Sequence, residues 1–139
     1  MFDFSKILPK VANNELNSPK IAVWGLAFKP DTDDIREAPA LYMIDKLLKS
    51  GASIVAYDPE AMENASSKLG NKIAFANSMN DAIKGADALL ICTEWHAFRN
   101  PDFSLLKNEL SSKAVFDGRN IYNPEEVKNI GLDYYSVGR

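Results

Sequence analysis

The cationic side chains best placed to bind an anion stand in the segment from Gly25 to Pro39, which has the sequence GLAFKPDTDDIREAP. Lys29 offers a point charge, whereas Arg36 offers a planar guanidinium that binds phosphate or carboxylate through two parallel hydrogen bonds. An apolar run precedes the segment, and Pro39 suits the first turn of a helix. Because backbone N–H groups at the start of a helix attract anions, this turn is a candidate phosphate site.

The same segment also allows a purely structural interpretation of its charges. Its acidic residues are Asp31, Asp33, Asp34 and Glu37. Ion pairs within the loop would occupy both cations, so the loop taken alone leaves ligand binding and internal pairing open. A metal site is disfavoured, because no EF-hand glycine or distal glutamate follows the acidic run.

A second candidate cation, Arg119, lies in the segment FDGRN at residues 116–120. A predicted strand ends there, Gly118 permits a tight turn, and the arginine projects beyond the end of the strand. Arg119 is therefore a candidate phosphate ligand contributed by a different strand. The alternative is an ordinary strand-end turn with a solvated arginine.

The segment TEWHAFR at residues 93–99 follows the most apolar run of the chain. Trp95 and Phe98 could cover a base or a sugar, but packing beneath the loop is the favoured interpretation. His96 is the single histidine and is expected at the surface, which excludes a metal site built from a histidine pair. Cys92 has no base beside it and is expected to be a buried structural thiol.

An acidic residue, Asp58, follows the second predicted strand, where dinucleotide-binding folds place the ligand of a ribose. Those folds also need a glycine-rich first turn, and here Gly25 stands alone in that turn. Asp58 is instead expected to cap a helix that begins at Pro59. The chain by itself is therefore not expected to form a standard NAD-binding domain.

The elements that position these residues follow from short apolar runs alternating with helical patterns. Strands are predicted at 20–24, 53–57, 72–75, 88–92, 114–116 and 134–137, and helices at 39–50, 60–69, 78–84, 103–109 and 124–128. The alternation predicts an α/β fold, namely a three-layer α/β/α Rossmann-like domain with a mostly parallel sheet of five to six strands. Ligands of such sheets bind beyond the carboxyl ends of the strands, where all three charged or aromatic segments lie.

The bulk composition limits the classes of protein that the chain can represent. Its 139 residues suit one domain, and its net charge of −3 gives no general attraction to nucleic acid or an anionic membrane. No apolar run approaches the roughly 20 residues of a membrane span, and residues 1–20 lack the apolar core of a signal peptide. With a single cysteine, which suits a reducing compartment, the expected location is the cytoplasm.

Four motifs carry a resemblance to a known family. They are GLAFKPDTDDIREAPA, YDP, TEWHAFRNPDF and FDGRNIYNP, in this order, and the chain ends near YYSVGR. Together they closely resemble the C-terminal domain of the UDP-glucose/GDP-mannose dehydrogenases, over essentially the whole chain. The TEW motif at residues 93–95 favours the UDP-glucose branch over the GDP-mannose and UDP-N-acetylmannosamine branches.

The resemblance implies an enzyme, commonly dimeric, in which a long helix joins two Rossmann-like domains. Residues 1–18, with their apolar stripe, would be the end of this helix and a linker, and residues 19–139 the UDP-sugar-binding C-terminal domain. The N-terminal domain of the same enzyme would bind NAD and carry the catalytic cysteine. Its reaction would oxidise UDP-glucose to UDP-glucuronate with two NAD, and no catalytic residue is expected in this chain, which alone would be inactive.

By position in the motifs, Phe28 and Lys29 resemble the pair that contacts the UDP-sugar, and Arg119 resembles a further ligand of it. Arg36 resembles the arginine that reaches the NAD held by the other domain. No metal is implied. A free-standing nucleotide-binding or regulatory module remains an alternative, as does the same domain of a GDP-mannose or UDP-N-acetylhexosamine dehydrogenase.

Overall fold

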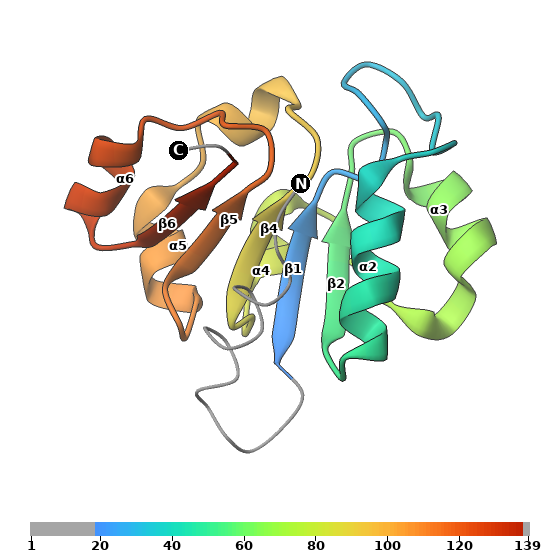
Figure 1. Ribbon diagram of the computed structural model, residues 1–139, viewed down its shortest axis with the longest axis horizontal. Helices are drawn as coiled ribbons and strands as arrows, with labels where there is room; N and C mark the ends of the chain where they lie inside the picture. Colours follow the sequence, from blue (N-terminus) through green and yellow to red (C-terminus); the bar gives the residue numbers. More distant parts are fainter. Residues whose placement is uncertain (1–18, 138–139) are drawn as a thin grey trace.

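Six parallel strands form the central sheet of the computed structural model, which describes residues 19–137 (Figure 1). The strands are β1 (Lys20–Trp24), β2 (Ser53–Tyr57), β3 (Ala74–Phe75), β4 (Ala88–Ile91), β5 (Ala114–Asp117) and β6 (Asp133–Ser136). Their order across the sheet is β3-β2-β1-β4-β5-β6. The predicted parallel sheet is confirmed, and its most apolar strand, β4, lies inside the sheet between β1 and β5.

Helices cover both faces of the sheet, which gives the three predicted layers (Figure 1). The helices are α2 (Pro39–Lys49), α3 (Met62–Leu69), α4 (Met79–Ile83), α5 (Phe103–Glu109) and α6 (Pro124–Ile130), with short 3-10 helices η2 (Gly70–Lys72) and η3 (His96–Arg99). Helices α2 and α3 pack on one face, and α4, α5 and α6 pack on the other. The fold is therefore a Rossmann-like α/β sandwich.

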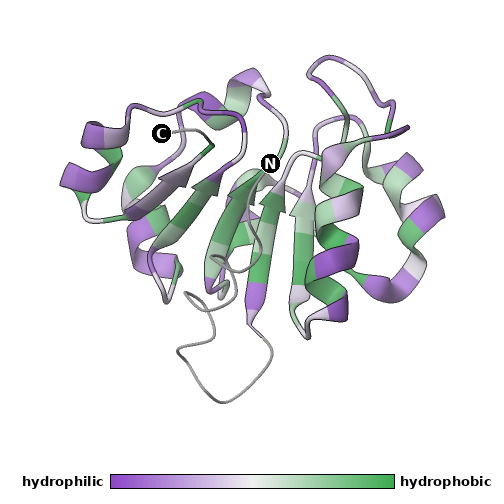
Figure 2. Ribbon diagram, in the orientation of Figure 1, coloured by the Kyte–Doolittle hydropathy of each residue, from purple (hydrophilic) through white to green (hydrophobic). Residues whose placement is uncertain are grey.

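Strand β1 illustrates why the apolar runs become buried strands. Ile21 and Val23 face the core beneath α2 and α3, whereas Ala22 and Trp24 face the opposite core, and all four are fully buried. Side chains alternate between the faces of a strand, so a strand covered on both sides must be apolar at every position. Figure 2 shows this pattern, with hydrophobic strands inside and hydrophilic helix surfaces outside.

Several predicted boundaries differ from the observed ones by one or two residues, and two of these differences have a clear local cause. The helix expected from Glu60 begins at Met62, because residues 59–61 form a turn before it. The third strand begins at Ala74, because η2 occupies the preceding residues. By contrast, Ser78 caps α4 as expected, since its hydroxyl accepts a hydrogen bond from the backbone N–H of Asp81 at 3.0 Å.

The expected inter-domain helix and linker at residues 1–18 lie outside the described residues. Within residues 19–137, no helix has the length and apolar character that crossing a membrane requires.

Candidate anion-binding site

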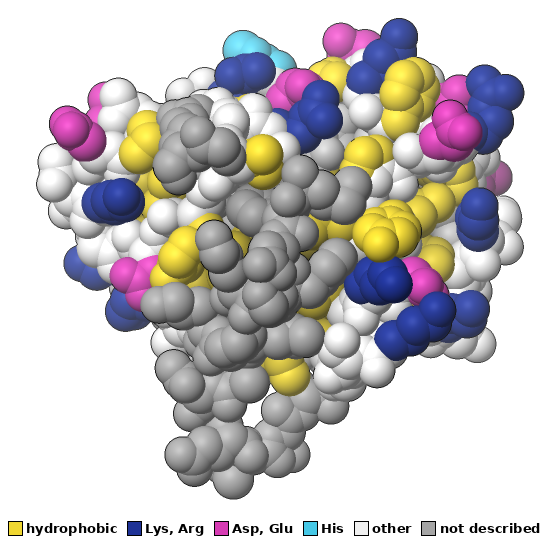
Figure 3. All heavy atoms as spheres, in the orientation of Figure 1, with side chains coloured by type: hydrophobic (Ala, Val, Ile, Leu, Met, Phe, Trp, Pro, Cys, Tyr) yellow, Lys and Arg dark blue, Asp and Glu magenta, His cyan; other side chains and the backbone are white. Residues whose placement is uncertain are grey.

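Three loops with the predicted functional residues leave the carboxyl ends of β1, β4 and β5, at the top of Figure 1. Lys29 lies in the loop after β1, and Arg119 lies in the loop after β5. Only β4 separates these two strands in the sheet. Since neighbouring strands are about 4.8 Å apart, the bases of the two loops are about 10 Å apart. Figure 3 shows basic and acidic side chains gathered along this edge.

The loop after β1 is held by the carboxylate of Asp58, which is fully buried at the end of β2. One oxygen accepts hydrogen bonds from the backbone N–H groups of Leu26 and Ala27, at 2.7 and 3.1 Å, and from the indole of Trp95, at 3.1 Å. The other accepts two hydrogen bonds of 2.8 Å from the backbone of Glu60 and Ala61. Asp58 therefore joins three loops at the carboxyl edge. Its predicted role as the helix cap is wrong, because Ala61 is the N-cap of α3 and Asp58 holds the turn that precedes this helix.

A close contact also joins the loops after β1 and β4. The buried hydroxyl of Thr93 donates a 2.6 Å hydrogen bond to the backbone oxygen of Ala27. Gly25 has a φ of +100°, and a Cβ atom there would lie 2.5 Å from Thr93. Only glycine fits this junction, because a side chain would combine a disfavoured backbone conformation with a steric clash.

A second buried carboxylate, Asp117, organises the loop that carries Arg119. Asp117 is fully buried at the end of β5 and accepts a 3.0 Å hydrogen bond from the backbone N–H of Arg119. Its other oxygen accepts hydrogen bonds from the backbone of Ile121 and Tyr122 and from the hydroxyl of Tyr134. The position of Arg119 is thus fixed through its backbone by a group in the interior.

Within the first loop, the structural interpretation holds for Arg36. Its guanidinium binds the Asp34 carboxylate through Nε and Nη2, with the shortest distance 2.7 Å. Hydrogen bonds from Arg36 lower the pKa of Asp34 to about 2. The pair is nevertheless on the surface, since 87% of the Arg36 side chain is exposed.

Lys29 differs from Arg36 because it forms no ion pair with any of residues 19–137. Its amine lies 5.3 Å from the centre of the Phe28 ring, which is itself 37% exposed. The ring offers this amine no conventional hydrogen-bond acceptor, so its N–H groups can still donate to a ligand. Phe28 and Arg36 also line an open depression, together with Asp34 and Glu37.

Arg119 binds a glutamate from the neighbouring loop. Its Nε and Nη2 atoms donate to the same oxygen of Glu94, at 3.2 and 2.7 Å. Burial raises the pKa of the Glu94 carboxyl, but the hydrogen bond and charge of Arg119 outweigh it, so the pKa lies below its ordinary value of 4.5. The pair is therefore fully charged at neutral pH.

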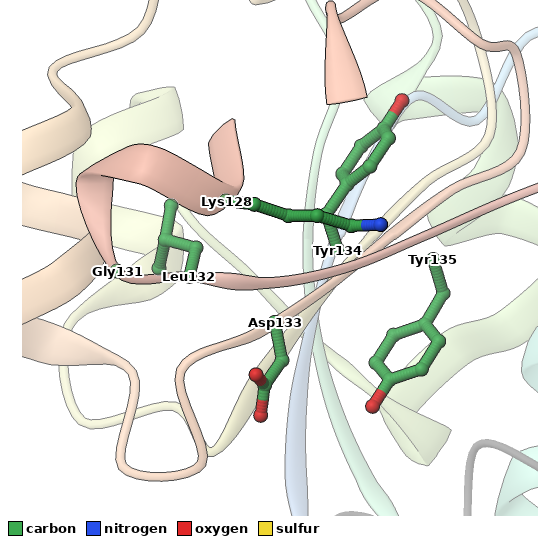
Figure 4. A pocket seen from close by; sticks show the side chains of 6 residues that line it. All are labelled: Lys128, Gly131, Leu132, Asp133, Tyr134 and Tyr135. Carbon is green, nitrogen blue, oxygen red and sulfur yellow. The ribbon is translucent and has the colours of Figure 1, made fainter. Parts of the chain in front are cut away.

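A second hollow lies along the edge strand β6 and is lined by Lys128, Gly131, Leu132, Asp133, Tyr134 and Tyr135 (Figure 4). Asp133 and Tyr135 point to one side of the strand, and Tyr134 points to the other. Lys128 is the single cation in this lining, and an acid accompanies it. The loops at the carboxyl edge carry four cations, namely Lys29, Arg36, Arg99 and Arg119, and are the better candidate for binding an anion.

The remaining expectations for the loop after β4 are confirmed. Trp95 and Phe98 are buried beneath the loop, and His96 is exposed. Cys92 is buried, and burial raises the pKa of its thiol to about 12, outweighing the opposing charge of Arg119. A thiol in this state is protonated at neutral pH and inert as a nucleophile. Within residues 19–137, no three His, Cys, Asp or Glu side chains are grouped so that they could hold a metal ion.

Glu94, Thr93 and Asp117 contribute to the site but were not among the predicted ligands. A signal for them exists in the sequence, since each is a polar residue at or just after the carboxyl end of an apolar strand. Such residues are placed at the ligand-binding edge of a parallel sheet.

Two features of standard NAD-binding domains differ at the carboxyl edge of this sheet. Both oxygens of Asp58, at the ribose-binding position, are occupied by five protein donors. The turn after β1 also lacks the glycines that let a pyrophosphate approach the backbone.

The parallel sheet and the helices on both faces define a Rossmann-like domain, and the cationic loops at its carboxyl edge form a candidate anion site. The sequence profile of the UDP-glucose/GDP-mannose dehydrogenase family, UDP binding domain, matches residues 22–124. The chain belongs to this family.

Individual relatives agree with this assignment. The chain is 44% identical over 128 residues to UDP-glucose 6-dehydrogenase from Rhizobium meliloti, covering 92% of this chain and 29% of that protein. It is 40% identical over 124 residues to UDP-glucose 6-dehydrogenase from Pseudomonas aeruginosa, covering 86% of this chain and 27% of that protein. The solved structure of a UDP-D-ManNAc dehydrogenase from Pyrococcus horikoshii superposes on this chain with a TM-score of 0.74 at 26% identity. The match covers 97% of this chain and 30% of that protein. The chain thus spans less than a third of the length of these relatives.

Proposed function

We propose that this chain is the UDP-sugar-binding domain of a UDP-glucose 6-dehydrogenase, which oxidises UDP-glucose to UDP-glucuronate with two NAD. The observation that carries the proposal is the pair of cations, Lys29 and Arg119, on loops after strands separated by one strand. Their bases are about 10 Å apart, a span that both side chains can close onto one diphosphate. Phe28 lies beside Lys29 and completes the substrate-binding set.

Arg36 has a different role in this proposal. Its exposed guanidinium contacts the NAD held by the N-terminal domain of the same enzyme. NAD accepts the hydride, and the catalytic cysteine also belongs to that other domain. This chain alone is therefore inactive, and the complete enzyme is a homodimer in the cytoplasm.

The sugar specificity favours UDP-glucose. The two relatives at 44% and 40% identity are UDP-glucose 6-dehydrogenases, whereas the UDP-D-ManNAc dehydrogenase is 26% identical. An N-acetylated UDP-hexosamine is the second candidate, because that solved structure has the same fold. Turnover of both sugars by the complete enzyme distinguishes the two.

Calorimetric titration of this chain with UDP measures the binding affinity and tests the site. We expect Lys29→Ala and Arg119→Ala each to weaken UDP binding about ten- to a hundredfold, since each removes one charge-assisted hydrogen-bonding partner. Lys49→Ala is the matched control, because Lys49 is an exposed lysine at the end of α2, away from the three loops. Equal UDP affinity in all three variants would refute the assignment of the site.

A further inference from the structure

The ion pair between Glu94 and Arg119 uses only part of the guanidinium. Nε and Nη2 donate to one glutamate oxygen, at 3.2 and 2.7 Å, so the pair uses one edge of the planar fork. Nη1 donates no hydrogen bond to any of residues 19–137. An arginine presents five N–H groups, so the opposite end of the fork remains available to an anion.

Arg119 is therefore held twice. Its backbone N–H donates to buried Asp117 at 3.0 Å, and its guanidinium is held by Glu94 from the loop after β4. A free arginine side chain samples many rotamers, and a ligand that binds it must bring it into one of them. A carboxylate that holds one edge reduces this cost before the ligand arrives.

The carboxylate of Glu94, by contrast, lacks a hydrogen bond from any described residue at one of its two oxygens. Its second oxygen, Oε1, is buried and has no hydrogen-bond partner within residues 19–137. A buried acceptor without a donor is unfavourable for folding. The fold thus gains little from Glu94, and a residue that costs stability at a ligand-binding edge indicates a role in binding.

We propose that Glu94 is a positioning residue for the UDP-sugar, which holds Arg119 by one edge and presents the other end to the diphosphate. The inference rests on the proposed function, in which Arg119 contacts the UDP-sugar. Glu94 itself does not contact the ligand, and its negative charge opposes the ligand charge. Glu94 favours binding because it fixes the orientation of the Arg119 guanidinium before the ligand arrives.

The test compares Glu94→Ala with Glu94→Gln in the complete enzyme, with KM for UDP-glucose, KM for NAD and kcat measured for each. Both variants lose the negative charge, but glutamine keeps an oxygen that accepts from Nε and Nη2 of Arg119. We expect KM for UDP-glucose to be about five- to tenfold higher in Glu94→Ala than in Glu94→Gln, the cost of ordering one long side chain. KM for NAD and the melting temperature should be the same in both.

Asp45 provides the matched control pair, because it also binds a cation, Lys49, but on the surface of α2. Asp45→Ala and Asp45→Asn should have equal KM values for UDP-glucose. Equal KM values for the two Glu94 variants would overturn the inference, and so would a parallel rise in KM for NAD or a lower melting temperature of Glu94→Ala. An inactive unmodified enzyme would instead refute the proposed function.

Discussion

Replacing Gly25 by alanine adds one carbon atom where the loops after β1 and β4 meet. The new Cβ would lie 2.5 Å from the side chain of Thr93 and 2.6 Å from its backbone nitrogen. Gly51 has nearly the same backbone conformation, with φ +99° against +100°, but no heavy atom lies within 4 Å of its Cβ position. The two alanine variants therefore separate backbone strain from steric clash.

The expected cost follows from these contacts. A left-handed backbone costs a non-glycine residue about 1–2 kcal/mol, which is the whole effect at Gly51. At Gly25 the overpacking adds about 1–3 kcal/mol, for a total of about 2–5 kcal/mol. The clash includes backbone at Thr93, so rotating or trimming its side chain does not remove the added cost.

Thermal and urea unfolding of the two variants measures this difference. Since 1 kcal/mol shifts the melting temperature of a chain of this size by roughly 4 °C, Gly25→Ala should melt well below Gly51→Ala. Its UDP affinity should also fall, because the loop that carries Lys29 begins at this junction. Equal melting temperatures for the two variants would show that Thr93 does not pack against Gly25, and the described junction would be wrong.

Three further predictions concern single side chains. The Cys92 thiol, with its pKa raised to about 12, should resist alkylation at pH 8.5 unless urea is present. The free energy of unfolding should fall as the pH rises above 9.0, because the thiol then ionises in the unfolded chain before it does so in the folded one. Asp58→Asn should lower both the melting temperature and UDP affinity, whereas Asp87→Asn, which loses a hydrogen-bonded carboxylate at the amino edge, should lower the melting temperature alone. In the complete enzyme, Lys29→Ala should raise KM for UDP-glucose about tenfold or more. Arg36→Ala should instead raise KM for NAD, and initial-rate kinetics can check both.

Local patterns were sufficient for most of the fold. The apolar runs of β1, β2 and β4, the proline at the start of α2 and the serine before α4 all act within a few residues. Their period and capping chemistry therefore predict the elements directly. The errors lie at boundaries, where a turn or a 3-10 helix replaced the expected first residues of α3 and β3.

The supports of the site depend on contacts that the local sequence does not contain. Glu94 and Arg119 are 25 residues apart, and they meet because β4 and β5 are neighbours in the sheet. Asp58 receives donors 31 to 37 residues away as well as its local ones. The local sequence suggested only a capping role for Asp58. Its hydrogen bonds to three loops could be predicted only with knowledge of the strand order.

The central claim is that cations from two strand ends, Lys29 and Arg119, bind one diphosphate. A crystal structure of the complete enzyme with UDP-glucose tests it most directly. We expect the Lys29 amine and the free end of the Arg119 guanidinium both to lie about 3 Å from diphosphate oxygens. If the diphosphate lies away from either side chain, with that side chain in solvent, then Lys29 and Arg119 do not form one binding site.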